Sequence, residues 1–155
     1  MDLTAEVVDR AAGVLLGQAI GDALGVPYEF ATPIQAGVAQ MIGGGLGPYA
    51  PGEWSDDTQM ALCIAQVAAT GVDLSSDDAL DAVAEAFIGW KDHGASDIDN
   101  QTATVLSRAA SSGDDARLSR RMTAISLELA QQGSAGNGGL MRTALGCQAS
   151  PARLG

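Results

Sequence analysis

The sequence predicts an all-α protein that folds as a single domain over residues 1–155. A chain of 155 residues suffices for one hydrophobic core and is short for two. Apolar residues make up 46% of it and charged residues 17%, a balance typical of a folded protein. Aromatic residues reach only 4%, whereas there are 20 glycines. Small side chains suit closely packed helices better than strands, which favour β-branched and aromatic residues.

The first predicted helix spans residues 3–24. Between Val7 and Ala19, apolar residues recur at spacings of three and four, the period of an amphipathic helix. Pro27 ends the pattern, because the residue before a proline disfavours helical backbone. A glycine also recurs at every fourth position, at Gly13, Gly17, Gly21 and Gly25. We interpret this glycine ladder chiefly as a packing feature that lets a neighbouring helix approach closely.

A long loop is predicted over residues 27–55. It contains all but one of the five prolines, together with the GGGLG run at 43–47. Loops of this length are uncommon inside compact domains and often carry function.

Further helices are predicted after this loop. A mostly buried helix is predicted over 57–69, since MALCIAQVAA has only one strongly polar residue, and the cap-forming residues at 73–78 precede a helix with an apolar face. Helical patterns also cover residues 100–111, 115–131 and, more briefly, 140–147. No segment is predicted to be a strand.

Charge and composition exclude several classes of function. A formal net charge of −11 disfavours nucleic-acid binding, which needs clustered Lys and Arg. Two cysteines and one histidine exclude a zinc finger and a disulfide-rich scaffold, and we expect a cytoplasmic protein. The acidic N-terminus lacks a signal-peptide layout, and we expect no membrane span. Cys63 is expected in the core and His93 without a catalytic partner, so no Cys-His enzyme is predicted.

The strongest local motif is GEWSDDTQM, residues 52–60, at the end of the loop and the start of the buried helix. One aspartate would suffice to cap the helix. The adjacent carboxylates of Asp56 and Asp57 repel each other unless a cation or the helix dipole compensates. With the hydroxyls of Ser55 and Thr58 they form an oxygen-only donor set that suits Mg²⁺, Mn²⁺ or Ca²⁺. The residues alone leave the cap and the metal site as equal alternatives.

Two further motifs carry polar groups. In SDIDNQT, Asp97 and Asp99 are best interpreted as caps of the following helix. In GNGGLMR, a glycine turn with Arg142 nearby is a common arrangement for holding an anion. Neither a GxxxxGK[ST] nor a GxGxxG pattern occurs, so no standard nucleotide loop is predicted.

Taken together and in order, four segments resemble the ADP-ribosylglycohydrolase family, which includes the dinitrogenase reductase activating glycohydrolases. These segments are GQAIGDALGVPYEF, GEWSDDTQM, SDIDNQT and GNGGLMR, and the resemblance covers residues 11–142. It implies a compact orthogonal helical bundle with a dinuclear Mg²⁺ or Mn²⁺ site. It also implies a hydrolase that removes ADP-ribose from a modified side chain, favouring an arginine-type bond, or from a related small molecule.

The resemblance also implies roles for particular residues. Ser55, Asp56 and Asp57 would be metal ligands. Glu29 would be a general base or would position a water, and Asp97 would contact the ribose or the leaving group. Two carboxylates are what glycosidic cleavage through an oxocarbenium-like state usually employs. The ADP-ribose pocket would be lined by Gly136, Asn137, Gly138, Gly139, Met141 and Arg142.

The sequence departs from the family pattern in four places and in length. GNGG stands where GNG followed by Ser or Ala is commoner. Ser55 stands where threonine is common, Asp99 where a glycine is expected, and Leu145 where a proline is usual. Family members continue well beyond Arg142 into an Asp-x-Asp-Ser/Thr segment with further metal ligands, so we expect this chain to lack the C-terminal half of the fold.

Two alternatives follow from that length. The chain is the N-terminal part of a hydrolase, or it is a non-catalytic half-domain that binds ADP-ribose or a partner. Half of a helical fold would expose apolar surface, so we also expect self-association.

Overall fold

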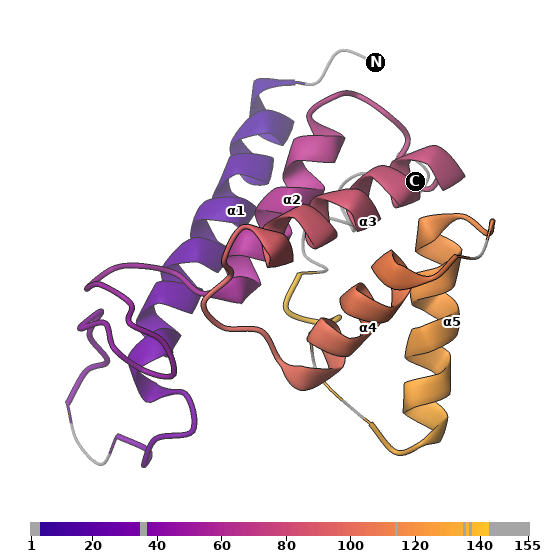
Figure 1. Cartoon of the computed structure of the whole chain (residues 1–155). Coiled ribbons are helices and arrows are strands. Elements are labelled where there is room, and N and C mark those ends of the chain that lie inside the picture. Colours follow the sequence, from indigo (N-terminus) through magenta and orange to yellow (C-terminus); the bar gives the residue numbers. More distant parts are fainter. Residues whose placement is uncertain (1–3, 35–36, 114, 135, 137, 143–155) are drawn as a thin grey trace.

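The computed structural model describes residues 4–34, 37–113, 115–134, 136 and 138–142, and its regular structure is helical (Figure 1). No strand occurs in these residues, and Gly44 and Tyr49 form one isolated antiparallel bridge. The prediction of an all-α fold is therefore confirmed. The elements, in order, are α1 (Ala5–Gly25), the 3₁₀ helix η1 (Val26–Tyr28), α2 (Asp56–Ala68), α3 (Asp77–Asp92), α4 (Asn100–Ser111) and α5 (Leu118–Gln131).

The helix boundaries agree closely with the sequence pattern except at α5. This helix begins at Leu118, three residues after the predicted start at Asp115. The last predicted helix, 140–147, lies mostly outside the described residues, and its described part, 140–142, is a turn. Within the described chain, no helix has the length and apolar character needed to cross a bilayer.

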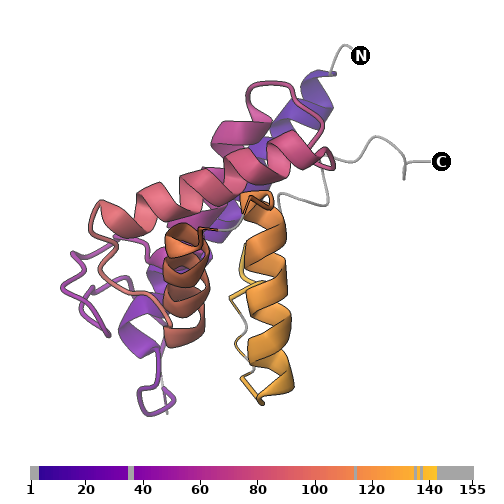
Figure 2. The ribbon, with the colours of Figure 1, turned by 45° about the vertical axis from the view of Figure 1, so that its right-hand side comes forward.

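Helix α3 is the centre of the bundle, because it packs against α2, α4 and α5. Figure 2 shows α3 lying across α4 and α5, which run side by side. The core between these helices is built around Met60, Cys63, Phe87 and Leu106. Burial raises the pKa of the Cys63 thiol, which fits its predicted place in the core.

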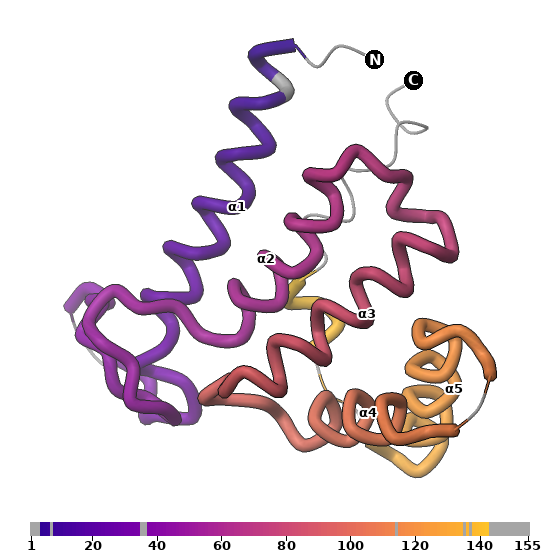
Figure 3. The backbone as a smooth tube through the Cα atoms, turned by 45° about the horizontal axis from the view of Figure 1, so that its top comes forward, coloured from indigo at the N-terminus to yellow at the C-terminus, as the bar shows by residue number. Residues whose placement is uncertain are grey.

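Helix α1 lies beside α2, away from α4 and α5 (Figure 3). A Cβ atom built at any glycine of the ladder would meet no described atom within 4 Å. The close helix approach predicted from the ladder is therefore wrong for the described chain. The reason is that α1 uses another face against α2, where Ala23 is buried, while Leu16 and Ile20 remain 63% and 56% exposed.

Two of the helices begin with a local side-chain cap. Ser76 accepts from the backbone N–H of Ala79 at the start of α3, and Asp99 accepts from two backbone amides at the start of α4. Helix α5 is held from outside, since Asp81 of α3 accepts from the backbone N–H and the hydroxyl of Ser119. This partner explains why α5 starts later than its own sequence predicts.

The predicted long loop is confirmed as a segment without long helices or strands, and close backbone contacts order it. The Tyr28 hydroxyl accepts from the backbone N–H of Gln40 at 2.9 Å, and Tyr49 is buried. Gly45 has a φ of +80°, and a Cβ built there would lie 2.2 Å from the carbonyl oxygen of Val26. Only glycine fits at this position without displacing the backbone.

We predict that Gly45→Ala destabilises the protein more than Gly44→Ala. Both glycines have a positive φ, but a Cβ at Gly44 would meet no described atom within 4 Å. Gly44→Ala should therefore cost only the left-handed strain of about 1–2 kcal/mol. Gly45→Ala adds a backbone clash, for a total of about 3 kcal/mol. Urea unfolding of both variants measures the difference, and equal losses would contradict the contact with Val26.

Candidate acidic site

Helix α2 begins at the SDD motif, but a carboxylate of α1 satisfies its free amides. Asp22 accepts from the backbone N–H of Ser55 at 3.0 Å and from that of Thr58 at 2.9 Å. It also accepts from both hydroxyls, each at 2.6 Å. Ser55 occupies the N-cap position and makes no side-chain cap hydrogen bond of its own. Asp22 therefore caps α2 from the neighbouring helix.

This external cap bears on the two interpretations of the SDD motif. Ser55 and Thr58 are buried, at 4% and 2% exposure, and both turn toward Asp22. Asp56 and Asp57 occupy the first turn of α2 and are only partly buried. Asp22 supplies the cap at Ser55 and Thr58, and the Asp57 carboxylate adds a hydrogen bond with its own backbone N–H, so capping does not account for Asp56.

Asp56 and Asp57 belong to a larger group of acidic side chains. Burial, followed by the charges of Asp57, Asp97 and Glu29, raises the pKa of Asp56 to about 6, although a hydrogen bond from the Ser55 hydroxyl opposes the rise. Burial and the charge of Asp22 raise the pKa of Asp57, while the Ser55 hydroxyl opposes the rise. These shifts show that the five carboxylates, which we call the acidic cluster, lie close enough to repel one another.

Glu29 enters the acidic cluster from the end of η1. Burial is the largest cause that raises its pKa, followed by the charges of Asp97, Asp57 and Asp22. Tyr49 lies at the same place, because burial and the charges of Asp97, Asp56 and Asp22 raise the pKa of its phenol. The long loop thus folds back over the start of α2.

The two aspartates of the SDIDNQT motif separate in the structure. Asp99 is the N-cap of α4 and accepts from the backbone N–H groups of Gln101 and Thr102 at 2.8 and 2.9 Å. The cap interpretation is therefore confirmed for Asp99. Asp97 makes no such cap and lies near Asp56, Asp57 and Glu29 instead.

The acidic cluster offers ligand atoms of the kind that a hard divalent cation prefers. The described residues do not supply enough of them for a complete site. Its groups are carboxylate and hydroxyl oxygens, which Mg²⁺ and Mn²⁺ prefer, and a cation would relieve their repulsion. In the part of the chain that the structure describes, no three Asp, Glu, His or Cys side chains converge as a complete cation site would require. A cavity of about 370 Å³ lies beside the cluster, and Asp22, Glu29, Ser55 and Asp57 contribute to its wall.

Gln18 connects the acidic cluster to the glycine turn. Its side-chain NH₂ donates to the backbone carbonyl of Asp57 at 3.0 Å and to that of Met141 at 2.8 Å. Its side-chain oxygen is buried and has no hydrogen-bond partner among the described residues. Through this amide, α1 fixes both the first turn of α2 and the segment that carries Arg142.

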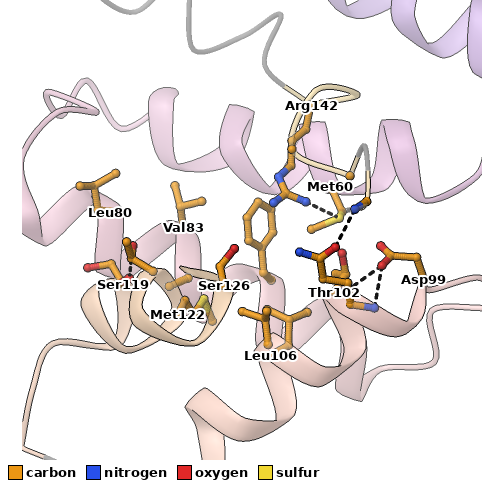
Figure 4. A pocket seen from close by; sticks show the side chains of 18 of the residues that line it. Met60, Leu80, Val83, Asp99, Thr102, Leu106, Ser119, Met122, Ser126 and Arg142 are labelled. Atoms are coloured by element: carbon orange, nitrogen blue, oxygen red, sulfur yellow. Dashed lines mark hydrogen bonds between the residues drawn. The ribbon is translucent and has the colours of Figure 1, made fainter. Parts of the chain in front are cut away.

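The glycine turn and Arg142 line a second cavity of about 510 Å³ between α3, α4 and α5 (Figure 4). The guanidinium of Arg142 lies 5.0 Å from the centre of the Phe87 ring, and its Nη1 lies 3.2 Å from Sδ of Met60. Burial lowers the pKa of Arg142, while Asp99 and Asp56 oppose that shift. The partly buried guanidinium lies against an apolar wall, and its forked N–H donors can pair with an anionic ligand group in competition with the two carboxylates.

The structure brings together most of the predicted site residues, but not all in the predicted way. Gly136, Gly138, Gly139 and Arg142 line the larger cavity, whereas the side chain of Met141 packs against the core. The backbone N–H of Gly136 donates to Gln101, so this amide already has a partner. The predicted Asn137 lies outside the described residues.

Sequence reasoning missed Asp22, Gln18 and Tyr49 as parts of this site. Gln18 and Asp22 are the polar interruptions of an otherwise apolar stretch, and they lie four residues apart on one face of α1. Such a pair is the signal that could have identified them. Tyr49 has no comparable signal, because its loop has no periodic pattern.

The fold and the site define a class of protein, a helical domain with a cluster of carboxylates beside a buried arginine. The model of the ADP-ribosylglycohydrolase family matches residues 3–154. The chain therefore belongs to the ADP-ribosylglycohydrolase family.

Curated relatives support this assignment over part of their own length. The chain is 38% identical over 110 residues to the ADP-ribosylarginine hydrolase Tri1 of Serratia proteamaculans (strain 568), covering 65% of this chain and 28% of that protein. It is 42% identical over 96 residues to Tri1 of Pseudomonas putida (strain GB-1), covering 62% of this chain and 25% of that protein. It is 34% identical over 143 residues to the ADP-ribosyl-[dinitrogen reductase] glycohydrolase of Rhodospirillum rubrum, covering 88% of this chain and 43% of that protein. The chain thus spans less than half the length of each.

We predict that Asp56→Asn stabilises the metal-free protein more at pH 7.5 than at pH 4.5. The folded state holds the Asp56 proton up to about pH 6, above the ordinary value of 3.8. Below pH 3.8 the folded state has the full stabilisation that this pKa shift provides. That stabilisation is lost as the pH rises through 6. Urea unfolding in EDTA at both pH values measures the effect. Asp9→Asn, which removes an exposed charge of α1, is the control, and an equal effect of Asp56→Asn at both pH values would contradict the prediction.

Proposed function

We propose that this chain carries the ADP-ribose and metal site of a hydrolase that releases ADP-ribose from a modified side chain. The observation that carries the proposal is the external cap. Because Asp22 satisfies the start of α2, Asp56 and Asp57 remain as paired, partly buried carboxylates beside a cavity. Membership of the ADP-ribosylglycohydrolase family supports the reaction class.

The proposed cofactor is Mg²⁺ or Mn²⁺, held by Ser55, Asp56 and Asp57. The oxygen-only donor set and the raised pKa of Asp56 support this choice, since a divalent cation offsets carboxylate repulsion. Bound there, such an ion supplies a positive charge that orients hydroxyl groups and lowers the pKa of a water. A dinuclear site would need further ligands beyond those that the described residues bring together.

The proposed reaction is hydrolysis at the anomeric carbon of the ribose. The glycosidic bond breaks, a water oxygen bonds to that carbon, and the proton lost by the water ends on the leaving group. Burial and its acidic neighbours raise the pKa of Glu29, and a raised pKa makes a carboxylate a stronger base. Asp97, also part of the acidic cluster, would contact the ribose or the leaving group.

The proposed ligand would also contact the glycine turn and Arg142. Among the described cations, Arg142 is the best candidate to bind a diphosphate, because it lies partly buried in the wall of the 510 Å³ cavity. A guanidinium pairs with phosphate oxygens in a forked geometry that a lysine cannot provide. The acidic cluster would in turn favour a cationic leaving group, so we propose ADP-ribosyl-arginine as the substrate. Two of the relatives named above are called ADP-ribosylarginine hydrolases.

A second candidate is a half-domain that binds ADP-ribose without hydrolysing it. Two observations favour it, namely that no three metal-binding side chains converge in the described chain and that the chain spans 25–43% of the relatives' length. Both candidates share the ligand and differ in turnover.

We predict release of free ADP-ribose from ADP-ribosyl-arginine in the presence of Mn²⁺, with a loss of about 100-fold or more in Asp56→Asn and Asp57→Asn. Chromatography measures the product, calorimetry measures ADP-ribose binding, and Asp9→Asn is the charge-matched control. Binding of ADP-ribose without turnover would select the half-domain. Absence of both binding and turnover would contradict the proposed function.

A further inference from the structure

Four hydrogen-bond donors converge on the carboxylate of Asp22. Oδ1 accepts from the Ser55 hydroxyl at 2.6 Å and from the Ser55 backbone N–H at 3.0 Å. Oδ2 accepts from the Thr58 hydroxyl at 2.6 Å and from the Thr58 backbone N–H at 2.9 Å. A carboxylate accepts at both oxygens and donates at neither, so it matches this arrangement and an amide does not.

The short contact to Ser55 determines which way its hydroxyl points. A serine hydroxyl has a single proton, and the 2.6 Å contact to Oδ1 of Asp22 takes it. Asp56 and Asp57 also lie within hydrogen-bond reach of this hydroxyl, so the lone pairs of Ser55 Oγ are available to an ion only while Asp22 holds the proton. That oxygen and Asp57 contribute to the wall of the same 370 Å³ cavity, where a cation would find an acceptor rather than a proton.

The backbone beside Ser55 is held from the same helix. Gln18 lies one turn before Asp22 on α1 and donates to the carbonyl of Asp57. Asp22 and Gln18 together hold the first turn of α2 against α1.

We propose that Asp22 is a positioning residue of the cation site, which acts by taking the Ser55 proton so that Ser55 Oγ presents lone pairs to the ion. This inference rests on the proposed function, since it assumes that Ser55, Asp56 and Asp57 bind a divalent cation. It adds a residue from α1 that would contact no ion itself.

Calorimetric titration of the whole chain with MnCl₂ tests this role. Asp22→Asn makes one side-chain atom a donor, which forces a hydroxyl to reverse, and affinity for Mn²⁺ should fall about 10- to 100-fold. Thr58→Val removes a donor to Asp22 but leaves Ser55 in place, and it should lower the affinity less than about threefold. An equal loss in both variants would overturn the proposal, because capping alone would then explain it.

A double-mutant cycle with Ser55→Ala separates positioning from support of the helix. If Asp22 acts through the Ser55 hydroxyl, Asp22→Asn should change the affinity little in the Ser55→Ala background. The same 10- to 100-fold loss in both backgrounds would overturn the proposal. Circular dichroism of each variant checks that α2 is folded before titration.

Two outcomes distinguish this inference from the proposed function. If the wild-type chain shows no saturable Mn²⁺ binding, the cation site of the proposed function fails and this inference fails with it. If the wild type binds Mn²⁺ and Asp22→Asn binds equally well, only this inference fails. Should Asp22→Asn not fold, NMR of the wild type decides instead. A Ser55 hydroxyl proton protected from exchange is expected, and a rapidly exchanging one would overturn the proposal.

Discussion

The carboxylate of Asp22 at the start of α2 is the interaction on which the site depends. It joins α1 to α2 through two backbone amides and two hydroxyls. A charged, partly buried acceptor with four donors is worth more than an ordinary surface hydrogen bond. With this cap in place, the first turn of α2 carries two adjacent carboxylates in addition to the one that caps it.

The remaining elements hold further groups around that turn. Loop 29–55 brings Glu29 and Tyr49 to the acidic cluster, and the segment before α4 brings Asp97. Gln18 links the same turn to the segment that ends at Arg142. The carboxylates and the buried arginine therefore flank one helix start, and this arrangement gives the family assignment a physical basis.

Much of the fold follows from sequence pattern because the helices have clear periods and local signals. The start of α4 follows from Asp99 alone, and the loop before α2 follows from its prolines and glycines. The start of α5 does not, because its partner Asp81 comes from α3. The site shows the same division. The sequence predicts Ser55, Asp56 and Asp57 as a motif, but the role of Asp22 depends on how α1 meets α2, and no local pattern encodes that contact. The glycine ladder misleads for a related reason, since spacing alone does not say which face of a helix is covered.

The central claim is that α1 caps α2 and so leaves the Asp56 and Asp57 carboxylates to a cation. Paramagnetic broadening by substoichiometric Mn²⁺ in an NMR spectrum of ¹⁵N-labelled protein tests it most directly, because broadening falls steeply with distance from the ion. The account predicts that the amide signals of residues 55–57, Glu29 and Asp97 broaden first. Broadening that is strongest at another acidic surface, such as Asp77, Asp78 and Asp81 at the start of α3, would contradict it.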